Sequence, residues 1–198
     1  KSKGLKNKNL KKIKKLSLIE HITISAKKSK LIDDIFISSD SKKYINIAKK
    51  RGAKSLFKSP RFLSGDNVNS MKVINHFLKK LKLIDKKYDY LILLEPTSPM
   101  TSSKDIDLAL KSLINDKKMD SIVGISKILK FDLRSIFTLN KKLKLNNIQK
   151  KIFNNFNRFK NENLYFLDGS LYISKIDKLI ANGGFISKKT KGFEFPYH

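Results

Sequence analysis

Residues 90–99 decide the fold, and they read Tyr90-Leu91-Ile92-Leu93-Leu94-Glu95-Pro96-Thr97-Ser98-Pro99. Four consecutive aliphatic residues without polar alternation predict a strand that is buried on both faces, as in a sheet with helices on each side. Two prolines end the strand and stiffen the loop behind it, which presents Glu95, Thr97 and Ser98. Ligands of open α/β sheets bind beyond the carboxyl ends of strands. The loop is therefore a candidate site, although an ordinary turn leading into a capped helix would show the same pattern.

Working outward from this strand, the chain alternates between extended runs and helical patterns. Ser17, with Glu20 three positions later, predicts a capping box at the start of the first helix. Helices are predicted at residues 17–29, 40–51, 68–83, 105–113 and 175–181, and extended runs at 34–40, 53–57, 90–94, 120–125, 163–166 and 170–174. This order predicts βαβ units in one α/β domain over residues 1–198, with a mainly parallel sheet and helices on both faces.

Residues 129–163 break the alternation. They are rich in Lys, Asn and Phe and show no clean period. We expect this segment to leave the sheet as a small excursion that serves contact between subunits.

Composition limits the classes of protein to consider. With 198 residues, 40% of them hydrophobic, the chain can bury a sizeable core. It has no cysteine, which excludes disulfides and thiolate chemistry and suits a reducing compartment. No apolar run approaches the ~18 residues that a membrane span needs. The first residue is lysine and no signal peptide follows, so we expect a piece of a longer cytoplasmic protein.

The net charge of +27 favours anionic ligands, nucleic acid among them. Lysine supplies the charge and is spread over nearly every segment. Only four basic residues are arginine, namely Arg51, Arg61, Arg134 and Arg158. Aromatic residues interleaved with base-reading arginines are missing, which argues against single-strand binding as the main function. A basic module that binds nucleic acid or another polyanion stays as an alternative.

The common catalytic fingerprints are absent from the sequence. It has no Gly-x-Gly-x-x-Gly or Walker-type loop, no Gly-x-Ser-x-Gly elbow, and only three scattered histidines. The opening loop is flexible, cationic and rich in amides. Lys3, Lys8 and Asn9 in it could wrap a triphosphate, although a basic chain terminus has the same composition.

Several separated motifs, taken in order, resemble the acylneuraminate cytidylyltransferases. The resemblance extends over nearly the whole chain, and residues 93–99 are its most specific part. The other motifs are Ser2-Lys3-Gly4-Leu5 through Lys8-Asn9, Ile37-Ser38-Ser39-Asp40, Pro60 to Asp66 with Ser70, Asn157-Arg158, and Asp168-Gly169-Ser170-Leu171-Tyr172-Ile173. The resemblance implies a Rossmann-like nucleotidyltransferase fold and a homodimer. It also implies an enzyme that uses CTP and Mg²⁺ to make a CMP-sugar, as for cell-surface polysaccharides, from a nine-carbon nonulosonic acid of the sialic, legionaminic or pseudaminic type.

The resemblance also assigns roles by position. Lys3 would neutralise the triphosphate as the catalytic cation. The nucleotide would be bound by Ser2, Lys3, Gly4, Lys8, Asn9 and Ser70. The sugar acid would be bound by Glu95, Thr97, Ser98 and Arg158, the last from the same subunit or from across a dimer interface.

The sequence departs from the family pattern at several of these positions. Glu95 replaces a glutamine, which exchanges an amide for an acceptor-only carboxylate and favours legionaminic or pseudaminic acids over sialic acid. Ser59 replaces an arginine, and Phe159 and Asp168 replace a glutamine and an asparagine. Met100-Thr101 stands where an arginine usually follows. These changes leave open a related sugar nucleotidyltransferase with another nucleotide, or a homologue that folds without catalysis.

Both ends differ from the family pattern as well. The chain starts after the family's first strand and stops before the Asp-x-Asp element that would hold Mg²⁺, so no metal ligand is expected within residues 1–198. Residues 1–198 alone are therefore expected to be inactive.

Overall fold

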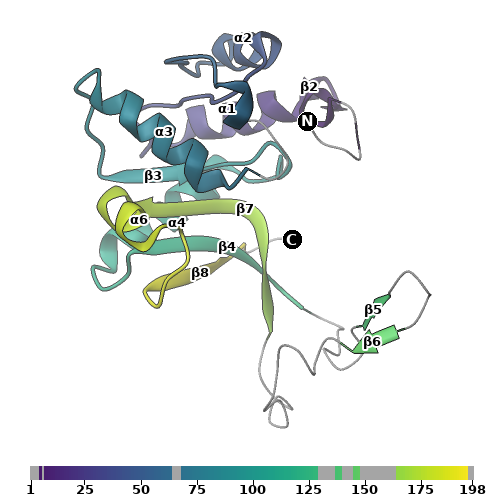
Figure 1. Ribbon diagram of the computed structural model, residues 1–198, viewed down its shortest axis with the longest axis vertical. Coiled ribbons are helices and arrows are strands. Elements are labelled where there is room, and N and C mark those ends of the chain that lie inside the picture. The colour runs from purple at the N-terminus through teal and green to yellow at the C-terminus, as the bar shows by residue number, and fades with distance from the viewer. Residues whose placement is uncertain are drawn as a thin grey trace. The chain divides into compact units, whose positions relative to one another are not determined.

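A computed structural model describes residues 5, 7–63, 68–128, 137–139, 145–147 and 164–195. Its helices are η1 (Lys8–Leu10), α1 (Leu18–Lys28), α2 (Lys42–Lys50), η2 (Arg61–Leu63), α3 (Ser70–Lys82), α4 (Ser103–Asn115) and α6 (Ile176–Asn182). Its strands are β1 (Lys12–Ile13), β2 (Leu16–Ser17), β3 (Tyr90–Leu93), β4 (Ser121–Lys127), β5 (Phe137–Leu139), β6 (Leu145–Asn147), β7 (Tyr165–Lys175) and β8 (Thr190–Glu194). Figure 1 shows their arrangement.

The chain divides into two compact units. Residues 1–125 and 168–198 form the first, and residues 126–167 form the second. Within the second unit, β5 and β6 pair as an antiparallel hairpin. The predicted excursion over residues 129–163 falls in this unit, and most of it lies outside the described residues. Its part in contact between subunits stays a prediction.

The main sheet contains four strands in the order β3-β7-β4-β8. β8 runs parallel to β4, whereas β7 runs antiparallel to β3, with Tyr90 opposite Lys175 and Leu93 opposite Tyr172. The α/β class is thus confirmed, but the sheet is mixed where the sequence predicted a mainly parallel one. The reason is β7, a continuous strand of eleven residues. Because it contains Asp168-Gly169, the sequence predicted two shorter runs in its place, and the direction of the strand was not recognised.

Helices cover both faces of this sheet, as predicted. Alternate residues of β3 point to opposite sides: Tyr90 and Ile92 pack with α4, whereas Leu91 and Leu93 pack with α3 and α6. The α4 side contains fully buried Leu113, Ile122, Leu171 and Ile173. In Figure 1 the strands β3, β7 and β4 lie side by side, with α3 over one face.

The predicted helices are confirmed with small shifts at their ends. Ser17 and Glu20 form the predicted capping box of α1. α2 begins later than predicted, because Ser41 and not Asp40 accepts the hydrogen bond from the Tyr44 amide. In α3, Asn69 caps the first turn, and Ser102 caps α4.

The segments predicted as strands at 34–40 and 53–57 form only one bridge, between Phe36 and Lys54. β3 also differs from the expectation, because all four of its residues are partly exposed where full burial was predicted. The cause is its position at the end of the described sheet, where only β7 pairs with it. Its other edge faces a large cavity.

Candidate active site

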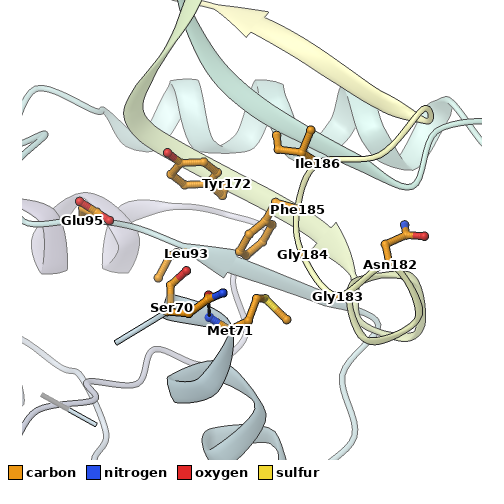
Figure 2. Close-up of a pocket in the computed structure, with 11 residues that line it drawn as sticks. Ser70, Met71, Leu93, Glu95, Tyr172, Asn182, Gly183, Gly184, Phe185 and Ile186 are labelled. Carbon is orange, nitrogen blue, oxygen red and sulfur yellow. Dashed lines mark hydrogen bonds between the residues drawn. The ribbon is translucent and has the colours of Figure 1, made fainter. Parts of the chain in front are cut away.

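A cavity of about 370 Å³ lies beyond the carboxyl end of β3. Leu93 and Glu95 line it from β3 and the loop behind it, and Tyr172 lines it from β7. The remaining walls are the start of α3, with Asn69, Ser70 and Met71, and the loop Asn182–Ile186 after α6. Figure 2 shows these side chains around a common space. We call it the site cavity.

The start of α3 forms one wall of the site cavity. The Asn69 side chain accepts a hydrogen bond from the Met71 amide at 2.8 Å and so fixes the first turn. Ser70 is the first helical residue. The first N–H groups of a helix have no partner within the helix and carry partial positive charge, which favours an anion. A phosphate or carboxylate is therefore the chemistry that this wall suits.

The opposite wall depends on a glycine. Gly183 ends α6 in the left-handed conformation with φ of 65° and donates its N–H to the Ile180 carbonyl. The chain then turns back so that Phe185, only 7% exposed, contacts Tyr172 with ring centroids 5.4 Å apart. These two rings give the cavity its apolar part.

Negative charge gathers next to Tyr172. Burial raises the pKa of Tyr172, and the nearby carboxylates of Glu95 and Asp168 raise it further. The phenol therefore stays protonated and can donate a hydrogen bond at neutral pH. Together with exposed Glu95 it places one donor and one strong acceptor at the rim of the cavity.

The proline-rich loop is tied to β7. Ser98 donates its hydroxyl to the Gly169 carbonyl at 3.3 Å, and buried Thr101 donates to the Ser170 carbonyl at 3.4 Å. Thr97 donates to the Glu95 carboxylate at 3.3 Å. The loop is therefore held at both ends, and the position of Glu95 follows from these contacts.

Asp168 and Ser170 are in turn fixed against β4. The Asp168 carboxylate accepts hydrogen bonds from the Ser170 amide at 2.9 Å and from the Ser170 hydroxyl at 2.5 Å. A Cβ on Gly124 would lie 2.1 Å from the Ser170 hydroxyl oxygen and 2.8 Å from Asp168. Only glycine at position 124 allows this close approach.

The structure brings together some of the residues that the sequence selected. Ser70 and Glu95 both line the site cavity, and Asn9 joins them around a second, larger cavity that adjoins it. Thr97 and Ser98 line neither cavity and act on the loop instead, as described above. Lys8 is half-buried in η1. Four further predicted residues lie outside the described residues, namely Ser2, Lys3, Gly4 and Arg158.

Sequence reasoning missed Tyr172 and the loop Asn182–Ile186. Tyr172 lies in a segment that the sequence did select. Because residues two positions apart in a strand lie on the same face, the pattern would have placed Tyr172 on the face of Ser170. Nothing local in the sequence brings the loop after α6 next to the start of α3, since that contact depends on the sheet order.

Within the part of the chain that the structure describes, no three potential ligands gather to hold a metal ion. These residues therefore do not fit a protein-bound magnesium on their own. The same described residues include no helix long and apolar enough to cross a membrane.

The fold is of the α/β class, with a cavity beyond the carboxyl end of β3. Among solved structures, CMP-2-keto-3-deoxy-manno-octonic acid synthetase complexed with CTP is similar, with a TM-score of 0.65 at 15% identity over 98% of this chain and 86% of that one. At this identity the likeness concerns the fold alone.

Comparisons of the sequence identify the family of this chain. The cytidylyltransferase family matches residues 1–174, and the chain belongs to that family. It is 31% identical to post-translational flagellin modification protein B of Campylobacter coli, over 96% of this chain and 79% of that protein. It is 29% identical to CMP-N,N'-diacetyllegionaminic acid synthase of Legionella pneumophila, over 96% of this chain and 80% of that protein.

Proposed function

We propose that this protein transfers the cytidylyl group of CTP to a nonulosonic acid. The anomeric hydroxyl oxygen of the sugar acid attacks the α-phosphorus, the bond from that phosphorus to the β-phosphate bridging oxygen breaks, and pyrophosphate leaves. The hydroxyl proton is lost to solvent or to a nearby base. The products are a CMP-sugar and pyrophosphate. The observation that carries this proposal is the likeness to a CMP-N,N'-diacetyllegionaminic acid synthase along 96% of the chain.

The geometry of the site cavity supports the same reaction. Catalysis of such a transfer consists mainly of positioning and of neutralising charge on the phosphates. The positive end of the α3 dipole at Ser70 favours an anion. Lys3, Lys8 and Asn9 are assigned to the triphosphate by their place in the sequence motif. Glu95 and Tyr172, at the opposite wall, are left to orient the sugar acid.

The choice of sugar acid follows from Glu95. A carboxylate can only accept hydrogen bonds, so it favours a sugar that presents O–H or N–H donors. A diacylated sugar acid has two amide N–H groups. We therefore expect a legionaminic- or pseudaminic-type acid, with Arg158 contributing to its binding and Thr97 holding the Glu95 carboxylate.

The proposal also covers the metal ion, the cellular compartment and the oligomeric state. Magnesium enters as the ion that neutralises the triphosphate, and because the described residues do not fit a metal on their own, no step is assigned to it. We place the enzyme in the cytoplasm, in keeping with the lack of cysteine, and we assign homodimer contact to residues 129–163.

The first experiment is thermal stabilisation by CTP, ATP, GTP and UTP, each with and without Mg²⁺, at two salt concentrations. Selective binding to the folded state raises the melting temperature by mass action. CTP is expected to give a larger shift than the other three nucleotides. Equal shifts that fade as salt rises would contradict the proposal and would favour general polyanion binding, to which the charge of +27 is suited.

The second experiment measures pyrophosphate release with different sugar acids for wild type and Glu95→Gln, both in the full-length protein. We expect the substitution to lower kcat/KM for N,N'-diacetyllegionaminic acid about tenfold, as for one hydrogen bond to a charged group, and to change N-acetylneuraminic acid less. Glu194→Gln is the matched control, because Glu194 is exposed in β8 and lines neither cavity. An equal loss with both sugars would contradict the assigned role of Glu95.

A further inference from the structure

The loop after α6, which forms one wall of the site cavity, is held by two hydroxyl groups of the main sheet. Ser121 begins β4 and is 2% exposed, and Thr190 begins β8. The two residues are partners in the parallel pairing of these strands. Their hydroxyl oxygens lie 2.8 Å apart, within hydrogen-bond distance. The register of the sheet therefore joins them as one unit, which we call the hydroxyl pair.

The hydroxyl pair binds the backbone of the loop at two points. The Ser121 hydroxyl donates to the Phe185 carbonyl at 2.6 Å, and the Thr190 hydroxyl can donate to the same oxygen at 3.1 Å. The Ser187 amide donates to the Thr190 hydroxyl oxygen at 2.7 Å. Each hydroxyl has one hydrogen, so Thr190 donates either to Ser121 or to the carbonyl. The four polar groups of this network thus all have a partner.

The anchored carbonyl belongs to the peptide group that joins Phe185 to Ile186. Because a peptide group is planar, fixing its carbonyl restricts the directions in which both side chains leave the backbone. Phe185 turns inward and is 7% exposed, whereas Ile186 is 55% exposed, and both line the site cavity. Figure 2 shows Phe185 beside Tyr172. The hydroxyl pair therefore sets which of the two side chains packs against Tyr172.

The first half of the loop is not fixed by packing. A Cβ atom on Gly183 or Gly184 would meet no atom within 4 Å beyond the neighbouring residues. Glycine also gives the backbone more freedom than any other residue. The position of the loop consequently depends on its second half, where Phe185 packs with Met71 and Val123. To this apolar contact, which has no preferred direction, the hydroxyl pair adds directional bonds.

We propose that the hydroxyl pair positions the sugar acid. It acts through the Phe185 ring, whose centroid is 5.4 Å from that of Tyr172, and does not touch the substrate. This inference rests on the proposed function, which assigns Tyr172 to the sugar acid. The start of α3, which is assigned to the phosphates, has its own cap at Asn69 and does not need the pair. Loss of the pair should therefore raise the KM for the sugar acid and not the KM for CTP.

The test compares Ser121→Ala, Thr190→Val and the double variant in the full-length protein, with CTP and N,N'-diacetyllegionaminic acid. In each single variant the remaining hydroxyl still donates to the Phe185 carbonyl, so the KM for the sugar acid should rise only about threefold. In the double variant the carbonyl loses both donors, and the cost of burying it unpaired should displace the loop. The KM should then rise about thirtyfold, more than the product of the single effects. The kcat and the KM for CTP should change less than about twofold.

A second readout does not depend on catalysis. Hydrogen exchange of the Ser187 amide should become about tenfold faster in Thr190→Val, because this variant removes the acceptor of that amide. Thr190→Ser keeps the hydroxyl and removes only a methyl group, so its exchange and its KM should both stay close to wild type. Unchanged exchange in Thr190→Val would overturn the hold on the loop and leave the proposed function intact. A wild-type protein that releases no pyrophosphate with any sugar acid would overturn the proposed function, while the exchange result still tests the loop.

Ser174→Ala is the matched control. Ser174 lies in β7 and is 1% exposed, and its hydroxyl lies 3.3 Å and 3.0 Å from the Asp120 and Lys175 carbonyl oxygens. Its loss should lower the melting temperature about as much as Ser121→Ala without raising the KM for the sugar acid. An equal rise in Ser174→Ala, or single effects that only multiply in the double variant, would overturn the proposal. If the double variant does not fold, equal KM values for Thr190→Val and Thr190→Ser would overturn it.

Discussion

The two sides of β3 differ in how they are held together. On the β7 side, Leu171, Ile173 and Ile122 are fully buried and strands pair without a break. On the other side, residues 35–37 are half-buried and pack against a smaller cluster around Ile19, Ala48 and Ala53. Polar contacts such as Tyr88–Asp34 and Arg51–Glu20 add to this packing. The first side is a packed core and the second is an open layer around a cavity. Residues of the candidate site lie on both, so its shape depends on each.

The largest expected effect comes from truncation on the packed side. Leu171→Ala removes a fully buried side chain of β7 that packs in the cluster with α4. It should lower the free energy of unfolding by about 3 kcal/mol, because the packed surroundings would leave a cavity. Ile35→Ala on the open side should cost only about 1 kcal/mol, because Ile35 is half-buried beside existing space. Urea unfolding measures both. Similar losses would mean that the two sides are packed alike.

The next largest effects are expected at two glycines, Gly124 and Gly192, which differ in what an added Cβ atom would meet. Gly124→Ala would force Cβ against the Ser170 hydroxyl and Asp168, and should cost about 2 kcal/mol and weaken nucleotide-dependent stabilisation. Gly192→Ala is the control in the paired strand, where Cβ meets the Ile125 Cδ1 atom at 2.4 Å. That methyl can rotate away, so the cost should stay below about 1 kcal/mol. Equal costs would show that the Asp168–Ser170 contact adjusts as readily.

The open side should also depend more on pH. The pKa of Glu20 falls from 4.5 to about 2, first because of the hydrogen bonds from Ser17 and then because of Arg51. A depressed pKa in the folded state gives stability that is present above pH 4.5 and is lost as the pH falls toward 2.

Glu20→Gln tests this dependence. It should cost about 1 kcal/mol at pH 7, because the charge of the carboxylate that accepts hydrogen bonds from Ser17 and Arg51 is lost. It should also make stability less sensitive to pH between 4.5 and 2. Unfolding by urea at a series of pH values measures the slope. Ser41→Ala, which removes the cap of α2 without removing a charge, is the control that should leave the slope unchanged.

Much of the fold could be predicted because it is encoded locally. The α1 capping box needs only Ser17 and Glu20, and the inner faces of α3 and α4 follow from helical spacing. The strand at residues 90–93 was found from its aliphatic run. The partial exposure of this strand could not be predicted, because burial depends on what lies at both edges of the strand.

The antiparallel direction of β7 and the loop after α6 were missed for a related reason. Strand direction is set by how distant segments pair, and Leu171 and Tyr172 would show the same alternation in either direction. Ser70 and Glu95 were found because each follows a recognisable motif. Tyr172 and Phe185 join them only through the sheet order, which no local pattern specifies.

The smallest expected effect concerns the hydrogen bond from Tyr88 to Asp34 on the open side. Burial and the bond to Asp34 raise the pKa of Tyr88 to about 12, so it remains a donor at neutral pH. Tyr88→Phe should cost under about 1 kcal/mol in urea unfolding, because Lys54 still pairs with Asp34. It should also remove the tyrosine that ionises near pH 12 from the alkaline absorbance titration.

Tyr44→Phe is the control, since its hydroxyl makes only a 3.4 Å bond to Asn7 at the surface and should contribute less. A loss in Tyr88→Phe no larger than that in Tyr44→Phe would mean that the bond to Asp34 does not help to hold the open side together.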